Sequence, residues 1–459
     1  MRKLLLATVA LIGASTGAAT IAEAQTASPT PGTVTVRLNG RFRFYGTIIS
    51  DRDNNVGGNK QANYGFFNYA RLFPGFDGVA ANGLKYGSSL EIRQDAGRGA
   101  GGGTYGSISG TTVTRGQLYF RREWGYLGTD QLGTLRLGST DSPSSLYMTG
   151  NFENFNDGGL NGDVQFQQPA ATQVTWPFAD VGNFYATTKA VYLSPQLYGL
   201  DFGVSFEPNT GAVNGEASGA CSTPNFQGST FLGSGVGVAS PGCDRLSSTP
   251  VNLESARRKN TVDALLRYRA SFGGFGVAAT GAYIVSSNVK DTAGVPFTNN
   301  PFAVGGARPN YDGLSIGDFG AAVTYGGFSV GGKYMFGRYN GQFGLDPKGA
   351  PNGEAFLVGA SYTIGPVVVG AHYLNYQSAG DIANAIAGRQ RKEQGLAAGA
   401  TYSLAPGVSL FADYLYNQRK QNGFDFTTNA SVSAAAPNGV TTKNKVTSNI
   451  FAVGTSFSW

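Results

Sequence analysis

Hydrophobic and polar residues alternate along most of this chain after residue 33, a pattern typical of β-strands whose two faces meet different surroundings. The first such segment is the clearest, because its odd positions carry Arg37, Asn39, Arg41 and Arg43. Its even positions are apolar: Val34, Val36, Leu38, Phe42 and Phe44. A soluble β-sandwich would bury such a face equally well, so this segment alone predicts a strand but not a membrane.

The connections between the predicted strands alternate strictly between short and long. Short Gly- or Pro-containing turns are predicted at 273–274, 326–327, 365–366 and 405–407, and long polar segments join the other strands. Barrels of the outer membrane have this asymmetry, with tight periplasmic turns and longer outer loops. We predict about 16 strands, at 34–49, 63–76, 83–95, 112–124, 132–140, 184–194, 199–207, 259–271, 275–287, 315–325, 327–337, 354–364, 366–377, 392–403, 408–418 and 447–459.

The predicted fold is therefore an all-β transmembrane antiparallel barrel. The sheet must close, because an open edge in hydrocarbon leaves backbone groups unpaired, and a barrel of this size encloses water rather than a packed core. The segments 208–258 and 419–446 are expected to be outer loops. Three lipid-facing sets are predicted: Val262, Ala264, Leu266, Tyr268 and Ala270; Phe275, Val277, Ala279, Gly281 and Tyr283; and Val408, Leu410, Ala412, Tyr414 and Tyr416.

The N-terminus predicts export. Arg2 and Lys3 precede an apolar run, 4–12, that is too short for a membrane-spanning helix of roughly 20 residues. Ala22-Glu23-Ala24 fits the rule for signal-peptide cleavage. We expect residues 1–24 to be a signal peptide and residues 25–459 to form one barrel domain.

Composition agrees with a barrel and argues against other classes. Charged residues make up 14% of the chain, against about 25% in soluble proteins. The net charge of +6 is spread along strands, so no nucleic-acid partner is predicted. Export favours a disulfide between Cys221 and Cys243, which lie in one long polar segment and would pin a loop. A metal or redox pair is the alternative reading of these cysteines.

The C-terminus carries the first specific resemblance. Phe451, Val453, Thr455, Phe457 and Trp459 alternate up to a terminal aromatic residue. This ending resembles the C-terminal insertion signal of Gram-negative outer-membrane proteins, with Phe457 and Trp459 in the matching positions. The family more often ends in Phe, so Trp459 departs from its pattern.

Two further stretches resemble the general diffusion porins of Gram-negative bacteria, particularly the alphaproteobacterial type. Gln131-Leu-Gly-Thr-Leu-Arg-Leu-Gly138, followed by Ser-Thr-Asp-Ser-Pro143, is similar to the fifth strand of that family and the start of its third loop. Ala190-Val-Tyr-Leu-Ser-Pro195 with Leu200-Asp-Phe-Gly-Val-Ser-Phe206 is similar to its sixth and seventh strands. The strand plan extends the resemblance over nearly the whole mature chain.

The resemblance implies that the segment 139–183 folds into the lumen and forms a constriction opposite a basic wall. The acidic candidates are Glu153, Asp157 and Asp163, together with Asp141 and Asp180. The basic candidates are Arg37, Arg41, Arg43, Arg71, Arg93, Arg115 and Arg136, with Lys85 and Arg121 as further candidates. Guanidinium groups stay charged at accessible pH, so arginines facing carboxylates would set a transverse field that favours polar solutes. Solvated lumen residues without a constricting role are the alternative.

Other motifs predict no chemistry. Gly101-x-Gly103-x-x-Gly106 matches a dinucleotide fingerprint but leads into a strand rather than a helix. His372 is the only histidine and has no recognisable catalytic partner in the sequence. One histidine and two cysteines cannot form a typical metal cluster. No catalytic residue, metal or other cofactor is therefore predicted.

The predicted function is passive diffusion of small hydrophilic solutes and ions through the cell outer membrane of a Gram-negative bacterium. The resemblance implies a homotrimer, and the predicted partners are outer-membrane lipids and the barrel-assembly machinery. One alternative is a channel selective for a sugar or an anion, with Tyr45, Tyr69, Tyr119 and Tyr185 along the lumen. Another is a barrel enzyme that uses His372, or an adhesin that binds through the loop 208–258.

Overall fold

The computed structural model describes residues 30–51, 55–56, 59–60, 62–95, 118–169, 171–178, 187–209, 258–288, 311–381, 389–427, 430–431 and 443–459. The predicted signal peptide, Arg115, Asp180, Tyr185, Cys221 and Cys243 lie outside these residues. The long strands are β1 (Thr33–Asp51), β4 (Tyr64–Val79), β5 (Lys85–Asp95), β6 (Tyr119–Thr129), β7 (Gly133–Ser139), β8 (Thr188–Leu193), β9 (Leu200–Asn209), β10 (Lys259–Phe272), β11 (Phe275–Val285), β13 (Ser315–Tyr325), β14 (Phe328–Arg338), β16 (Gly353–Ile364), β17 (Val367–Ser378), β18 (Arg391–Ala405), β19 (Val408–Lys420) and β22 (Lys445–Ser458).

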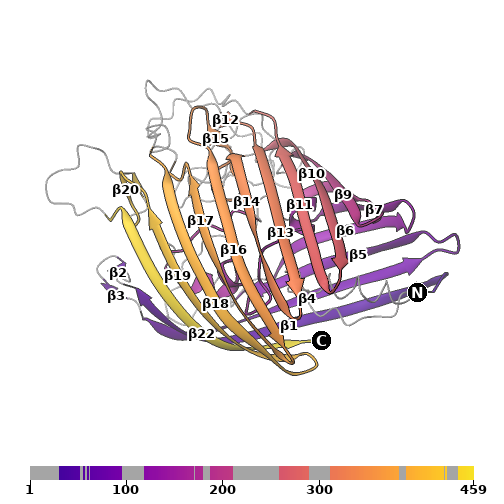
Figure 1. Cartoon of the computed structure of the whole chain (residues 1–459), viewed down its shortest axis with the longest axis horizontal. Helices are drawn as coiled ribbons and strands as arrows, with labels where there is room; N and C mark the ends of the chain where they lie inside the picture. Colours follow the sequence, from indigo (N-terminus) through magenta and orange to yellow (C-terminus); the bar gives the residue numbers. More distant parts are fainter. Residues whose placement is uncertain are drawn as a thin grey trace, which may run out of the picture.

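These 16 strands form one closed antiparallel barrel, as predicted. Each strand pairs with its sequence neighbours, and β1 pairs with β22 to close the sheet, with Phe42 opposite Phe457. The short turns, the start of β1 and the C-terminus lie at one end of the barrel (Figure 1). Among the described residues, no helix is long and apolar enough to cross a bilayer.

Short elements occupy some of the connections at the other end. They are β2 (Asn55–Val56) with β3 (Asn59–Lys60), β12 (Tyr311–Asp312) with β15 (Asp346–Pro347), and β20 (Phe424–Asp425) with β21 (Ala430–Ser431). The connection between β7 and β8 contains α2 (Pro143–Leu146) and the 3-10 turns η1 (Gly159–Asn161) and η2 (Asp163–Gln167). Most residues of the candidate site lie in this last connection or contact it.

The outer wall is apolar because alternate residues of every strand point away from the lumen. Val36 on β1 is 77% exposed and Phe66 on β4 is 80% exposed. The three predicted lipid-facing sets on β10, β11 and β19 all point outward, alternating with buried residues. An outward apolar band is what a barrel needs to lie in a bilayer.

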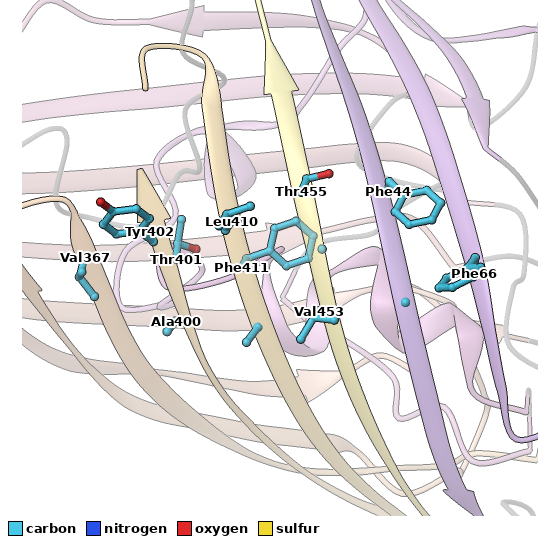
Figure 2. Close-up of a pocket in the computed structure, with 13 residues that line it drawn as sticks. Phe44, Phe66, Val367, Ala400, Thr401, Tyr402, Leu410, Phe411, Val453 and Thr455 are labelled. Atoms are coloured by element: carbon cyan, nitrogen blue, oxygen red, sulfur yellow. The ribbon is translucent and has the colours of Figure 1, made fainter. Parts of the chain in front are cut away.

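The outer wall is hollowed where the first and last strands meet. A shallow depression of about 580 Å³ spans β1, β4, β17, β18, β19 and β22 (Figure 2). Its lining combines small residues such as Gly46, Ala400 and Ala412 with larger apolar side chains. The ring of Phe411, which is buried, lies against Gly454 at this point. The outer side of the seam is therefore apolar.

One strand differs from its predicted position. The sequence predicts a strand at 112–124, whereas β6 runs from Tyr119 to Thr129. The register between β5 and β6 shifts between Glu91 and Ile92, so Arg121 is an extra residue in a β-bulge. The alternating pattern therefore does not predict which residues of β6 face the lumen, because a shift of one residue exchanges the lumen and lipid faces.

Candidate functional site

The described parts of the connection from β7 to β8, residues 140–169 and 171–178, fold into the barrel, and we call them the inner loop. They are largely buried. Near its start, the backbone N–H and the hydroxyl of Ser144 both donate to Asp263 Oδ2 on β10, at 2.8 and 2.7 Å. Further along it reaches β17 and β18, so it crosses much of the lumen.

His372 on β17 holds the inner loop to the wall through both ring nitrogens. Nδ1 donates to the carbonyl oxygen of Phe152 at 2.9 Å, and Nε2 accepts from the backbone N–H of Leu160 at 3.3 Å. The imidazole is 1% exposed and lies against the rings of Phe155 and Trp176, with centroids 5.5 and 5.7 Å away. The only histidine of the chain therefore has a positioning role, which the sequence did not reveal.

Glycines on the inner wall make room for the side chains of the inner loop. A Cβ atom on Gly370 would lie 2.5 Å from Phe155 Cδ1, and one on Gly395 would lie 2.6 Å from Leu160 Cδ1. Neither distance is compatible with normal van der Waals contact. The same close approach occurs at Gly203 with Pro143, Gly359 with Phe152 and Gly399 with Asn156. These glycines form a seat for the loop across β9, β16, β17 and β18.

The wall formed by β1, β4 and β5 is basic and faces the lumen. Arg71 on β4 donates through Nη2 to both carboxylate oxygens of Asp163, at 2.8 and 2.9 Å. Arg43 on β1 donates to the carbonyl oxygen of Asp157 at 3.3 Å and to Ser456 Oγ at 3.3 Å. The inner loop is therefore bound to the basic wall as well as to the opposite wall.

The three acidic candidates of the inner loop differ in their surroundings. Burial raises the pKa of Asp163, but Arg71 and Arg93 outweigh it and hold that pKa well below its usual range. Burial raises the pKa of Asp157 to about 6, and its Oδ2 accepts from the backbone N–H of Val164 at 2.9 Å. These contacts make Asp163 the carboxylate that joins the loop to the arginines, and Asp157 a group that also braces the loop.

Glu153, the third acidic candidate, is bonded within the inner loop. Its Oε1 accepts from Asn161 Nδ2 at 2.8 Å. Burial raises the pKa of Glu153 to about 7, which places its titration near neutral pH. Its charge therefore depends on pH in the range where the protein would work.

The β-bulge places two consecutive arginines on the lumen side of β6. Glu91 on β5 accepts from Arg93 Nε at 2.5 Å and from Arg121 Nη1 at 3.0 Å. Arg122 lies 3.3 Å from Glu91 Oε2 and 3.1 Å from Asp141 Oδ1. The sequence reasoning missed Arg122, and the signal that could have found it is the Arg-Arg pair inside an alternating strand.

Other basic candidates lie toward the short-turn end of the barrel. Arg37 forms an ion pair with Asp77 at 2.5 Å. The guanidinium of Arg136 lies 4.3 Å from the centroid of the Trp124 ring. Lys85 pairs with Asp130 at the turns themselves, at 2.5 Å. None of these three contacts involves Glu153, Asp157 or Asp163.

Tyr45 and Tyr69, predicted as lumen residues, are both buried inside the barrel. Tyr45 stacks on Phe67 with centroids 4.0 Å apart, and Tyr69 contacts Arg71, whose Cζ lies 4.1 Å from the ring centroid. Of Tyr119 only the backbone is described, in β6. At the C-terminus, Phe457 packs on Phe42 with centroids 6.2 Å apart.

The backbone of Trp459 exchanges two hydrogen bonds with Gly40, at 3.1 and 3.2 Å. Together with the Phe42–Phe457 contact, they place the last residues of the chain on the seam between β1 and β22. Their role as an insertion signal stays a prediction. Among the described residues, no group of three His, Cys, Asp or Glu side chains could hold a metal ion.

Comparison with known proteins identifies the family. The family model described as Gram-negative porin matches residues 7–423. Among solved structures, the anion-selective porin from Comamonas acidovorans is similar with 14% identity and a TM-score of 0.51, covering 93% of this chain and 100% of that chain. The outer membrane channel DcaP of Acinetobacter baumannii is similar with 13% identity and a TM-score of 0.51, covering 94% and 100%. None of the curated proteins matches the chain in sequence.

Proposed function

This chain belongs to the Gram-negative porin family and forms a channel in the outer membrane, and we propose that small hydrophilic solutes and ions diffuse passively through it. In this function the inner loop and the basic wall together form the constriction of the channel. The alphaproteobacterial type of the family stays a prediction.

The ion pair between Arg71 and Asp163 is the observation that carries the constriction. It joins a carboxylate of the inner loop to an arginine of the wall at 2.8 Å. Around it, Arg41, Arg43 and Arg93 supply further positive charge on one side of the lumen. Charges of opposite sign across a narrow aqueous gap produce a transverse field, in which a polar solute can exchange water contacts for protein contacts. An apolar solute gains no such compensation.

The inner loop would keep this gap at a fixed width. His372, the glycine seat and the bond from Ser144 to Asp263 hold the loop against one wall. A loop fixed at several points keeps its carboxylates in place, so the gap stays open without a ligand. We further propose a homotrimer, for which membership of the porin family is the support.

A substrate-selective channel is the second candidate, and one observation favours it. Tyr69 lies inside the barrel next to the arginines rather than at a membrane interface. Aromatic rings beside cationic groups form surfaces that planar or charged solutes can follow. The solved structure from Comamonas acidovorans, which shares the fold, is described as anion-selective.

Single-channel current in a planar bilayer tests the proposed function. The refolded protein should give ohmic current steps in KCl, in groups of three if the channel is a trimer. Folding is checked beforehand by the shift in gel migration between heated and unheated samples. Folded protein that gives no conductance would contradict the diffusion function.

A further inference from the structure

Three arginines stand in one row on the lumen face of neighbouring strands. Arg41 on β1 is the cross-strand partner of Arg71 on β4, and Arg71 is the cross-strand partner of Arg93 on β5. Like charges directly opposite one another destabilise a sheet. A row of this kind therefore needs anions close by.

Carboxylates compensate two of the three arginines. Asp163 pairs with Arg71 at 2.8 Å, and Glu91 pairs with Arg93 at 2.5 Å. Arg41 makes no ion pair or hydrogen bond within the described parts of the chain, and its Nε is buried without a partner. The side chain of Arg41 is half-buried, so water compensates its charge only in part and an anion that pairs with it is favoured.

The cluster as a whole has a surplus of positive charge. Arg121 and Arg122 share Glu91 with Arg93, and Arg122 also contacts Asp141. The cluster therefore contains more arginines than carboxylates: Arg41, Arg71, Arg93, Arg121 and Arg122 against Asp163, Glu91 and Asp141. Arg43 adds a further positive charge beside Arg41 on β1, and Asp157 and Asp413 lie near Arg43, so arginines still outnumber carboxyl groups. Small anions will accordingly be attracted to this part of the lumen.

The ring of Tyr69 lies beside the guanidinium of Arg41 and uses none of its hydrogen-bond donors. The Cζ atom of Arg41 lies 5.6 Å from the centroid of the Tyr69 ring, and that of Arg71 lies 4.1 Å from the same centroid. The hydroxyl of Tyr45 lies 3.5 Å from that of Tyr69. Cation–π contact attracts a guanidinium to a ring while its N–H groups stay available. A planar fork of donors matches the two oxygens of a carboxylate or phosphate group.

We propose that Arg41 is an oxyanion-binding subsite of the channel, and that solutes bearing a carboxylate or phosphate group bind there as they pass. This inference rests on the proposed function and gives it a preferred class of solute. Arg71 is already paired with Asp163, and Arg93 is already paired with Glu91. The anionic group of the solute therefore pairs with Arg41. The binding is weak enough for release, because the solute keeps part of its water shell in the lumen.

Block of chloride current by added oxyanions tests the subsite. Phosphate and acetate are titrated separately into KCl while current through wild type, Arg41→Gln and Arg41→Lys is recorded. Loss of one charge-assisted contact should raise the half-blocking concentration by about tenfold in Arg41→Gln. Arg41→Lys should keep the reversal potential of the wild type but block less well, because lysine lacks the planar fork.

Arg338→Gln is the matched control, since it removes one positive charge from an exposed site at the end of β14. It should leave the block unchanged. Weaker block by acetate alone identifies a carboxylate site, by phosphate alone a phosphate site, and by both a general oxyanion site. Equal block of wild type and Arg41→Gln by both anions overturns the inference while the porin function stands.

A second measurement separates the two proposals. If folded protein does not conduct, the proposed function fails, and calorimetric titration of the detergent-solubilised protein with phosphate then tests the subsite alone. Heat from wild type that is lost in Arg41→Gln and retained in Arg338→Gln supports the subsite. The same heat in wild type and Arg41→Gln, or none in either, contradicts it.

Discussion

Arg71 of β4 and Asp163 of the inner loop are joined by two contacts, at 2.8 and 2.9 Å, from a single guanidinium nitrogen. Their side chains are 6% and 17% exposed, so water screens the pair only in part. The two residues are 92 positions apart in the sequence. This pair ties the inner loop to the basic wall, opposite the anchors of the loop on β10 and β17.

Asp163→Asn should make the channel more selective for anions, because it removes a negative charge beside the arginine row. Leaving Arg71 unpaired should also destabilise this end of the loop by about 3 kcal/mol. The reversal potential in a KCl gradient measures the selectivity. The double variant Arg71→Gln/Asp163→Asn restores the charge balance and should return that potential toward the wild-type value. Identical potentials for the single and double variants would show that the pair does not set the selectivity.

His372→Ala should release the inner loop from β17 without preventing the barrel from folding. The substitution leaves the Leu160 N–H and the Phe152 carbonyl without their partners, at a cost of about 1–3 kcal/mol for each buried group. The loop should then fluctuate, and single-channel recordings should show more open-channel noise and brief closures. His372→Asn, which can replace one of the two bonds, should be intermediate. Wild-type noise in His372→Ala would mean that the glycine seat alone holds the loop.

Gly370→Ala should displace Phe155 and with it the adjoining part of the inner loop. The added methyl group would lie 2.5 Å from the ring, so the loop must shift. Mean conductance should change while the heat-induced gel shift of the folded barrel is kept. Gly281→Ala on the outer face of β11 is the control, because its methyl group would lie at an ordinary 3.5 Å from Phe319. Equal conductance of both variants and wild type would show that the seat tolerates a side chain.

Lowering the pH from 8 to 5 should shift the selectivity further toward anions. The pKa of Glu153 is raised to about 7 and that of Asp157 to about 6, in both cases chiefly by burial, so the loop loses negative charge over this interval. Reversal potentials at steps of pH measure the shift, and Glu153→Gln should remove its upper part. A reversal potential that does not vary with pH in the wild type would contradict the assignment.

The same two carboxyls should affect stability in a defined direction. Because their pKa values in the folded protein exceed the ordinary values of 4.5 and 3.8, the folded state binds protons more tightly than the unfolded state. Their contribution to the free energy of unfolding therefore falls as pH rises through this range. The contribution of Asp163 to the free energy of unfolding changes with pH in the opposite direction, because its pKa is lowered in the folded protein. That contribution is lost only below about pH 4. Glu153→Gln should accordingly unfold at a higher temperature than wild type at pH 8, and at the same temperature at pH 4.

The sequence by itself determined the barrel. The alternation of Val34 to Phe44 with Arg37 to Arg43 fixed which face of β1 meets lipid, because a strand has a period of two and the two faces have different solvents. The strand segments and the alternation of short and long connections between them then gave the strand count. These features are local in the sequence, so they could be predicted without coordinates.

Only the tertiary structure decided the details of the candidate site. The bulge at Arg121 turned Arg122 into the lumen, and no count along the strand could place it, since the shift depends on how β6 pairs with β5. The role of His372 depends on Phe152 and Leu160, which lie more than 200 positions away in the sequence. Arg41 has no ion pair among the described residues, because the folded inner loop brings the carboxylate of Asp163 to Arg71 instead. The alternation of polar and apolar residues predicts whether a side chain faces lipid or the lumen. Which side chains pair across the lumen depends instead on the path of the inner loop through the closed barrel.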